Sequence, residues 1–213
     1  MTPNWTPTWT RRQALLSTLA AAALPVARSL LRPAAAAEVG EDGMHKQPWF
    51  HQSFLDLKED LAEAEAAGKG LAVFFEQRGC PYCGELHKTS LADPEVAGYI
   101  RDNFLALQIN LYGAREVTDF DGKKMEERKL AERWRVNFTP TIVFFPSKVA
   151  DAVGKSGRDA EVWRLQGYWK AFHTHATFVY VKTQGYKQEP NFQRWLSEYA
   201  EKLRAEGKDV KLW

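Results

Sequence analysis

The amino-acid sequence predicts an α/β domain in which a mixed central β-sheet is flanked by helices, with an extra helix at the C-terminus. Short apolar runs between glycine and polar residues carry this prediction, because they are typical of strands buried on both faces. The runs cover residues 71–75, 104–109 and 141–145, and a fourth strand is predicted over 161–166. The first two runs flank a helical segment and should pair in parallel. The last two are joined by a short link, which favours a hairpin.

Amphipathic segments between and after these runs predict the helices. The first begins at Ser53, ends before the glycines of 68–70, and opens with a pair, Ser53 and Asp56, that resembles a capping box. We expect its buried face to be formed by Phe54, Leu57, Leu61 and Ala64. Further helices are predicted over 94–100, 126–136, 171–183 and 190–206. The polar segment 111–127 should be an insertion or a small hairpin, and 147–160 should consist of turns.

The composition is that of one globular domain. Of the 213 residues, 45% are hydrophobic, which is enough to form a sizeable core. The formal net charge is only +2, so there is no electrostatic argument for a nucleic-acid partner. We expect a monomer.

The first 37 residues predict an export signal. A polar start leads through Arg11-Arg12 into a small and apolar stretch, and Ala34–Ala37 offers a cleavage site before Glu38. The arginine pair resembles a twin-arginine signal, although Ala14 stands where that signal usually has Phe, which leaves ordinary Sec export open. The apolar stretch is short for a transmembrane span, and an uncleaved anchor or a tail is the alternative.

Cleavage near Ala37 would place the mature protein in the periplasm. Residues 1–37 contain four arginines and no acidic residue, so their removal changes the formal charge from +2 to −2. We expect 38–48 to be a linker or arm and 49–213 to be the working domain.

A pair of cysteines, Cys80 and Cys83, follows the first predicted strand and opens a helix-like segment. In disulfide exchange the thiolate is the nucleophile, so a reactive cysteine needs exposure, a lowered pKa and a second thiol nearby. A C-x-x-C pair at a helix N-terminus meets these needs, because the free N–H groups favour negative charge on the first sulfur. We therefore expect Cys80 to attack and Cys83 to resolve.

Two other readings of the pair are weaker. A structural zinc site needs about four ligands, yet there is no second C-x-x-C. Of the five histidines, His87 follows Cys83 by four residues and could share its helix face, whereas nothing ties the pair His173 and His175 to the cysteines. A purely structural disulfide would close a loop of two residues and would stabilise little. We expect no metal and no cofactor other than the cysteine pair itself.

C-x-x-C after a strand and at the start of a helix resembles the redox motif of the thioredoxin superfamily. The segment Phe138-Thr139-Pro140-Thr141 resembles the cis-proline element of the same superfamily. This resemblance implies a thioredoxin fold and a thiol:disulfide oxidoreductase. It also implies that Thr139 and Pro140 lie beside the cysteines, with the Thr139 backbone turned outward to pair with an extended substrate segment.

The sequence departs from thioredoxins proper at the buried acid. The usual position of that acid is occupied here by Phe74, and Glu76 stands two residues closer to the cysteines on the same face of the strand. Glu76 either accepts the proton of Cys83, if it is buried, or is a solvated residue at a strand end. The dipeptide between the cysteines, Pro81-Tyr82, also differs from that of thioredoxins and does not fix the direction of electron flow.

The C-terminal part resembles the periplasmic thioredoxins of bacterial sulfur-oxidation clusters, the SoxW-like proteins. The matching motifs are Gly167-Tyr168, Tyr180-Val181, Gly185-Tyr186 and 192–196, although such aromatic residues would also serve simply to pack two terminal helices. This resemblance implies a reductase for the carrier cysteine of a thiosulfate-oxidising system, supplied with electrons by a membrane thiol transporter of the CcdA type. An oxidase or isomerase of the same fold and a non-catalytic binding module are the alternatives.

Overall fold

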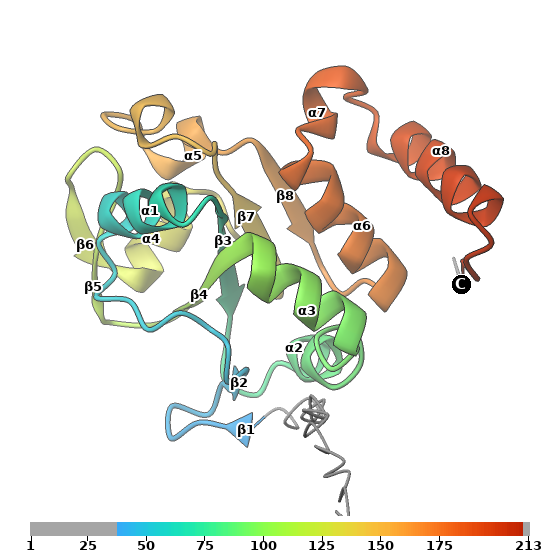
Figure 1. The fold of residues 1–213 in the computed structure, drawn as a ribbon. Helices are drawn as coiled ribbons and strands as arrows, with labels where there is room; N and C mark the ends of the chain where they lie inside the picture. Colours follow the sequence, from blue (N-terminus) through green and yellow to red (C-terminus); the bar gives the residue numbers. More distant parts are fainter. Residues whose placement is uncertain (1–37, 211–213) are drawn as a thin grey trace, which may run out of the picture. The chain divides into compact units, whose positions relative to one another are not determined.

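The computed structural model describes residues 38–210 and contains a four-stranded mixed sheet (Figure 1). Its strands lie in the order β4-β3-β7-β8, with bounds Phe104–Asn110, Gly70–Glu76, Thr141–Phe144 and Trp163–Gln166. β3 pairs in parallel with β4 and antiparallel with β7, and β7 and β8 form an antiparallel pair. The predicted strands and both predicted pairings are confirmed.

The sheet is covered by helices on both faces, and β3 shows why its apolar run is continuous. Side chains of Leu71, Val73 and Phe75 enter one core cluster, while those of Ala72 and Phe74 enter the other. Helices α1 (Leu57–Ala66) and α4 (Glu127–Arg133) lie over the first face, and α3 (Pro94–Asn103) and α6 (Ala171–Lys182) lie over the second (Figure 1). A strand with helices on both sides has no solvent-exposed face, so its apolar run is continuous. This confirms the prediction of a strand buried on both faces.

Helix α1 begins later than predicted. Its N-cap is Asp56, whose carboxylate accepts hydrogen bonds from the N–H groups of Lys58 and Glu59. Leu55 takes a left-handed backbone conformation with φ of 63°, so Ser53 and Phe54 cannot continue the helix toward the N-terminus. The prediction that Phe54 belongs to the buried face is therefore wrong: Phe54 is 100% exposed, and Leu55 is buried instead.

Two connecting segments contain more regular structure than the sequence required. Within the polar segment 111–127, β5 (Glu116–Thr118) and β6 (Lys124–Glu126) form the small hairpin that was one of the two predicted forms. Within 147–160, where turns were expected, the chain forms a 3₁₀ helix, Val149–Asp151, and a short helix α5, Gly157–Ala160. Ser156 caps α5 by accepting a hydrogen bond from the N–H group of Asp159.

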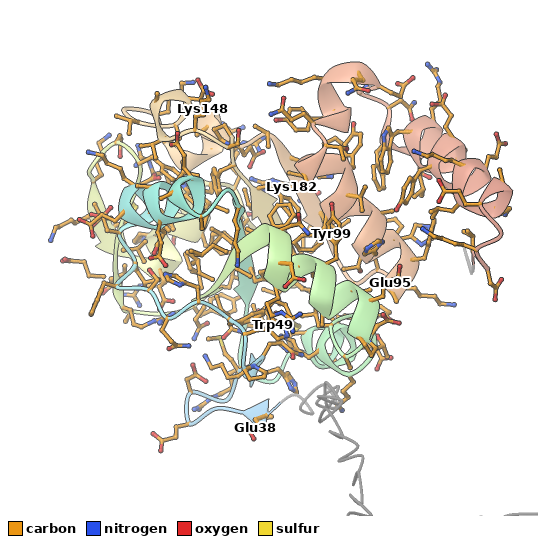
Figure 2. The ribbon with its side chains drawn as sticks, in the orientation of Figure 1. Glu38, Trp49, Glu95, Tyr99, Lys148 and Lys182 are labelled. Carbon is orange, nitrogen blue, oxygen red and sulfur yellow. A yellow bond between two sulfur atoms is a disulfide. The ribbon has the colours of Figure 1, made fainter. Side chains whose placement is uncertain are left out.

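The C-terminal helix α8 (Phe192–Ala205) is attached mainly through aromatic rings. It follows α6 and the single turn α7 (Gly185–Gln188), and lies beside α6 (Figure 1). The ring of Trp195 packs 4.9 Å from that of Tyr180 in α6 and 4.9 Å from that of Tyr199 in its own helix. Tyr99 of α3, labelled in Figure 2, packs 4.8 Å from His175 of α6. The predicted extra C-terminal helix is confirmed.

The N-terminal segment of the described chain forms a hairpin. Its strands are β1 (Glu38–Val39) and β2 (His45–Lys46), and the side chains of Met44 and Gln47 are buried. The segment after β2, which includes Trp49 (Figure 2), then runs to α1, and the N–H group of His51 donates a hydrogen bond to the carbonyl of Ala106 in β4. The predicted export signal, 1–37, lies outside the described residues. Over 38–210, none of the helices has the length and apolar character needed to cross a membrane.

Candidate active site

The two cysteines lie where β3 ends and helix α2 (Pro81–Glu85) begins, and they are joined by a disulfide. Gly79, with φ of 69°, makes the turn out of the strand, a conformation that favours glycine. Cys80 is the N-cap of α2, and its Sγ accepts a hydrogen bond from the N–H group of Cys83 over 3.1 Å. Pro81 occupies the first helical position, where its missing N–H group has no effect on the helix.

Both cysteines are buried, but unequally. Cys80 is 4% exposed and Cys83 is 1% exposed, so the sulfur at the helix N-terminus is the one nearer to solvent. A thiol near the surface can meet another protein's sulfur, whereas an enclosed thiol can meet only its neighbour. Attack by Cys80 and resolution by Cys83 remain the expected roles of the two sulfurs.

The structure brings Thr139 and Pro140 to the cysteine pair. The peptide bond between them is cis, as expected from the sequence. The Thr139 Oγ1 atom lies 3.2 Å from Cys80 Sγ, and the Thr139 carbonyl oxygen lies 3.7 Å from the same sulfur. A disulfide sulfur carries no proton, so the hydroxyl of Thr139 is the donor in the first contact. Four of the predicted site residues therefore meet at one place.

Exposed aromatic residues surround this place. Tyr82 in α2 and Phe138 beside Thr139 are 64% and 47% exposed. The loop after β8 also lies beside the site, because the N–H group of Gly167 donates a hydrogen bond to the carbonyl of Pro140 at 2.8 Å. In the same loop, the Trp169 carbonyl accepts a hydrogen bond from Ser90 at 2.7 Å. In the sequence, Gly167-Tyr168 stands out only through a family resemblance, and nothing local places this loop at the site.

The fifth predicted residue, Glu76, is the last residue of β3 and is fully buried. Its carboxylate accepts hydrogen bonds from His87 Nε2, at 2.9 and 3.1 Å, and from Gln108 Nε2 at 2.8 Å. Of the two forms considered for Glu76, the solvated strand end is therefore excluded. The acid that Phe74 displaces has a buried counterpart two residues further along the strand.

His87 is a candidate functional residue that the sequence alone did not identify. It belongs to a π-helical segment, Leu86–Ser90, that continues α2, and its side chain is fully buried. Its Nδ1 atom lies 3.3 Å from the side-chain amide nitrogen of Gln47. The spacing of four residues from Cys83 was the available signal, since that spacing places both side chains on one helix face. The contribution of Gln47 had no signal, because only the tertiary fold brings the N-terminal hairpin to this helix.

His45, also on the hairpin, packs against the active-site helix. A Cβ atom at Gly84 would lie only 2.8 Å from His45 Nε2, so the glycine between Cys83 and Glu85 allows this close approach. Burial lowers the pKa of His45. The ring of His45 therefore stays neutral at physiological pH, 5.6 Å from the ring of His87.

Among residues 38–210, no group of three or more histidine, cysteine, aspartate or glutamate side chains is arranged to hold a metal ion. The histidines 173 and 175 both lie on α6, and His87 is engaged by Glu76. The two sulfurs and the buried Glu76 are the reactive groups that the described residues bring to this part of the fold.

Residues 57–182 match the family described as a thioredoxin-like domain. The chain belongs to this family. The matched region includes both cysteines, Glu76, His87 and the Thr139-Pro140 bond, while the N-terminal hairpin and α8 lie outside it. Together with the mixed sheet flanked by helices, the match establishes the thioredoxin fold.

Solved structures of the same fold resemble this thioredoxin-like chain at low identity. A thioredoxin-fold protein from Helicobacter pylori is 22% identical, with a TM-score of 0.49 over 67% of this chain and 94% of that one. A thioredoxin from Thermus thermophilus is 27% identical, with a TM-score of 0.47 over 63% and 90%. A DsbH oxidoreductase is 14% identical, with a TM-score of 0.40 over 68% and 94%. No curated protein sequence matches the chain.

Proposed function

We propose that this protein is an exported thiol:disulfide oxidoreductase that reduces disulfides in client proteins. One observation carries the proposal: Cys80 opens helix α2 with its sulfur 3.2 Å from the Thr139 hydroxyl, at the end of the chain segment that contains the cis bond. This juxtaposition provides a nucleophile, a resolving thiol and, at Thr139, a neighbouring backbone segment to which a client chain could pair. The redox centre is the cysteine pair, and the proposal includes no other cofactor and no metal.

The reaction follows from the arrangement of the sulfurs. In the reduced protein, the Cys80 thiolate attacks one sulfur of a client disulfide, and the other client sulfur leaves with the electron pair of the broken bond. Cys83 then gives up its proton, which we assign to Glu76, and attacks Cys80 in the mixed disulfide. The Cys80–Cys83 bond forms, and the second client sulfur leaves as a thiolate that is protonated by water. Two electrons pass from the protein to the client, and a donor dithiol must restore them.

The location, donor and client are proposed from the sequence. The arginine pair at 11–12 and the alanines at 34–37 support export to the periplasm. The resemblance of the C-terminal motifs supports a role beside a sulfur-oxidation system, with a sulfur-carrier protein as client and a membrane thiol transporter of the CcdA type as donor. A thiol-bearing client and a membrane donor are protein partners, so a monomeric oxidoreductase is sufficient.

A trapping experiment tests this function. Cys83→Ser cannot resolve the mixed disulfide, so clients should accumulate on Cys80 in periplasmic extracts, as bands that reductant removes. Cys80→Ser is the matched control, because it has lost the attacking sulfur and should trap nothing. Equal, reductant-sensitive trapping by both variants, or none by either, would reject the catalytic role and favour a binding module.

The reduction potential of the Cys80–Cys83 couple tests the direction of electron flow. A reductase should lie near the potential of thioredoxins, about −270 mV, whereas a potential near about −120 mV would indicate an oxidase. The measurement uses the mature protein, residues 38–213, equilibrated in glutathione or dithiothreitol buffers. Because the direction is read from the equilibrium, this result is independent of which client is captured.

A further inference from the structure

Behind the cysteine helix lies a buried chain of polar side chains that the N-terminal hairpin completes. Glu76 and His87 are both 0% exposed and are joined at 2.9 Å. Gln108 Nε2 donates to Glu76 at 2.8 Å and also to the carbonyl of His45 at 2.8 Å. On the far side of the histidine, Gln47 Nε2 faces His87 Nδ1 at 3.3 Å. Two of the groups in this chain belong to the segment 45–47, outside the part of the chain that matches the thioredoxin-like family.

These contacts determine where the histidine proton resides. The amide nitrogen of Gln47 lies within bonding distance of two acceptors, His87 Nδ1 at 3.3 Å and the His87 carbonyl at 3.4 Å. A group that donates to Nδ1 requires that Nδ1 carry no proton, and the ring proton is then on Nε2, directed at Glu76. The imidazole is thus neutral, and the Glu76 carboxylate is stabilised by neutral donors, His87 and Gln108.

Two of the cations near the pair, Lys46 and Arg115, are engaged by other partners. Lys46 Nζ bonds Gln108 Oε1 at 2.7 Å and pairs with Asp42 at 2.7 Å. Arg115 bonds the Gln108 carbonyl and the carboxylate of Glu127. Lys88 lies near His45, which is neutral. The remaining neighbours are apolar: Phe50 packs 5.6 Å from the His87 ring, and Phe74 packs 5.1 Å from Phe50.

We propose that His87 and Gln47 are positioning residues for the proton of Cys83: Gln47 holds the imidazole neutral, so that the proton released by Cys83 is taken up by the Glu76 carboxylate. The inference rests on the proposed oxidoreductase function. His87 follows Cys83 by four residues in the helical segment that continues α2, and both side chains are buried, so the spacing directs them to one face of that segment. If Nδ1 also carried a proton, the imidazolium would stabilise the Glu76 carboxylate and weaken it as a proton acceptor.

The proton and electrons balance in the resolving step. Cys83 loses its proton to Glu76, which becomes a neutral carboxylic acid that still accepts from His87 and Gln108. The electron pair on the Cys83 sulfur forms the bond to Cys80, and the departing sulfur takes the pair of the broken bond. Glu76 later returns its proton to water or to the departing thiolate.

Stopped-flow reaction of the reduced protein with 5,5′-dithiobis(2-nitrobenzoate) separates the two sulfurs. Attack by Cys80 releases one thionitrobenzoate, and attack by Cys83 on the Cys80 adduct releases the second, so two absorbance phases report the two steps. Glu76→Gln should slow the second phase by about a hundredfold at pH 6.5, as expected for the loss of a general base. The two proteins should converge near pH 9, where hydroxide deprotonates Cys83 without help.

Gln47→Glu tests the positioning role, because a carboxylate at this place would hold a second proton on His87 Nδ1. It should slow the second phase by about fivefold at pH 6.5, leave the first phase unchanged, and converge with the wild type near pH 9. The control is Gln52→Glu, which makes the same charge change on an exposed residue of the same segment and should alter neither phase. The double variant Gln47→Glu with His87→Gln tests whether the slowing comes from a second proton on His87 or from the new charge at position 47. A glutamine at position 87 can donate to Glu76 but has no second proton to gain. In that background the effect of Gln47→Glu should vanish.

Three results have distinct meanings. An unchanged second phase in Gln47→Glu, or an equal slowing in the His87→Gln background, overturns the inference while leaving the proposed function intact. Slowing of both phases together with a lower unfolding midpoint also overturns it, because that pattern is structural. Failure of the wild type to release the second thionitrobenzoate would instead reject the proposed function itself.

Discussion

The hydroxyl oxygen of Thr139 lies 3.2 Å from the Sγ atom of Cys80, although the two residues are 59 positions apart in the sequence. The contact joins the start of the active-site helix to the segment that enters β7. The cysteine pair and the Thr139-Pro140 element, two motifs far apart in the sequence, therefore form one site.

We expect Thr139→Val to slow the attack by Cys80. In the reduced protein the Thr139 hydroxyl is positioned to donate to the thiolate, and hydrogen bonds to charged groups are among the stronger ones. Removing it should lower the rate of Cys80 alkylation by iodoacetamide at pH 7 by about fivefold to tenfold. The control is Thr183→Val, which loses a hydroxyl bonded to the Val179 carbonyl in α6. Equal rates for the wild type and Thr139→Val would show that the contact has no role in the reaction.

A buried tryptophan packs so close to Gly157 that there is no room for a side chain at this position. A Cβ atom at this position would lie 2.0 Å from Cζ2 of Trp134, a side chain that is 0% exposed and bonded to Asp119. We expect Gly157→Ala to lower the free energy of unfolding by about 3 kcal/mol, because neither the ring nor the backbone has room to shift. Urea unfolding followed by tryptophan fluorescence measures this change.

Gly98 provides the comparison for that substitution. It lies inside α3, and the nearest atom to an added Cβ is Arg101 Nη2 at 4.0 Å. We expect Gly98→Ala to raise the free energy of unfolding by roughly 0.5–1 kcal/mol through helix propensity. A similar loss in both variants would contradict the steric explanation for Gly157.

The sheet was predictable because its signals are local and consistent. The apolar run of β3 is bounded by Gly68-Lys69-Gly70 and Gly79, and burial on both faces follows from its composition alone. The cysteine pair and the Thr139-Pro140 element were predictable for a related reason, since each is a compact motif with a fixed backbone role. Their meeting in space followed from the fold that the motifs implied.

What the sequence did not predict depends on tertiary neighbours. The burial of Glu76 was undecided because a carboxylate at a strand end is buried only if partners exist, and those partners, His87 and Gln108, come from separate elements. Gln47 lies on a segment that reads as a polar linker, and its position follows from the hairpin packing over the cysteine helix. The start of α1 was misplaced because the left-handed turn at Leu55 leaves no mark on the hydrophobic pattern.

The corrected start of α1 gives its own prediction. Leu55 is 5% exposed and belongs to the core cluster beneath α1, whereas Phe54 is fully exposed. We expect Leu55→Ala to lower the free energy of unfolding by about 2–3 kcal/mol, the range for truncating a buried leucine, and Phe54→Ala to change it by less than about 0.5 kcal/mol. Guanidinium unfolding of the two variants decides between the observed turn and a helix that begins at Ser53. In that helix Phe54 would be buried, and Phe54→Ala would cause the larger loss of unfolding free energy.

The carboxyl group of Asp60 gives the stability of the fold a pH dependence. Asp60 lies on the buried face of α1, where it accepts a hydrogen bond from Ser53 Oγ at 2.7 Å and lies 3.5 Å from His51. Burial raises the pKa of Asp60 to about 6, above its ordinary value of 3.8, although Ser53 and His51 oppose the change. The folded protein therefore binds this proton more tightly than the unfolded chain. The resulting stabilisation is fully present below pH 4 and is lost as the pH rises through about 6.

We expect Asp60→Asn to remove this dependence, since the amide oxygen can still accept from Ser53 but carries no charge. Relative to the wild type, the variant should gain about 2–3 kcal/mol of unfolding free energy between pH 4 and pH 7, with most of the change between pH 4 and 6. Urea unfolding at intervals of half a pH unit measures the difference. Asp102→Asn, at an exposed carboxyl on α3, is the matched control, and its free energy of unfolding should change with pH as that of the wild type does. If the difference between Asp60→Asn and the wild type is flat across this range, then burial does not hold the proton on Asp60, and the hydrogen bond from Ser53 is sufficient to keep its carboxylate charged.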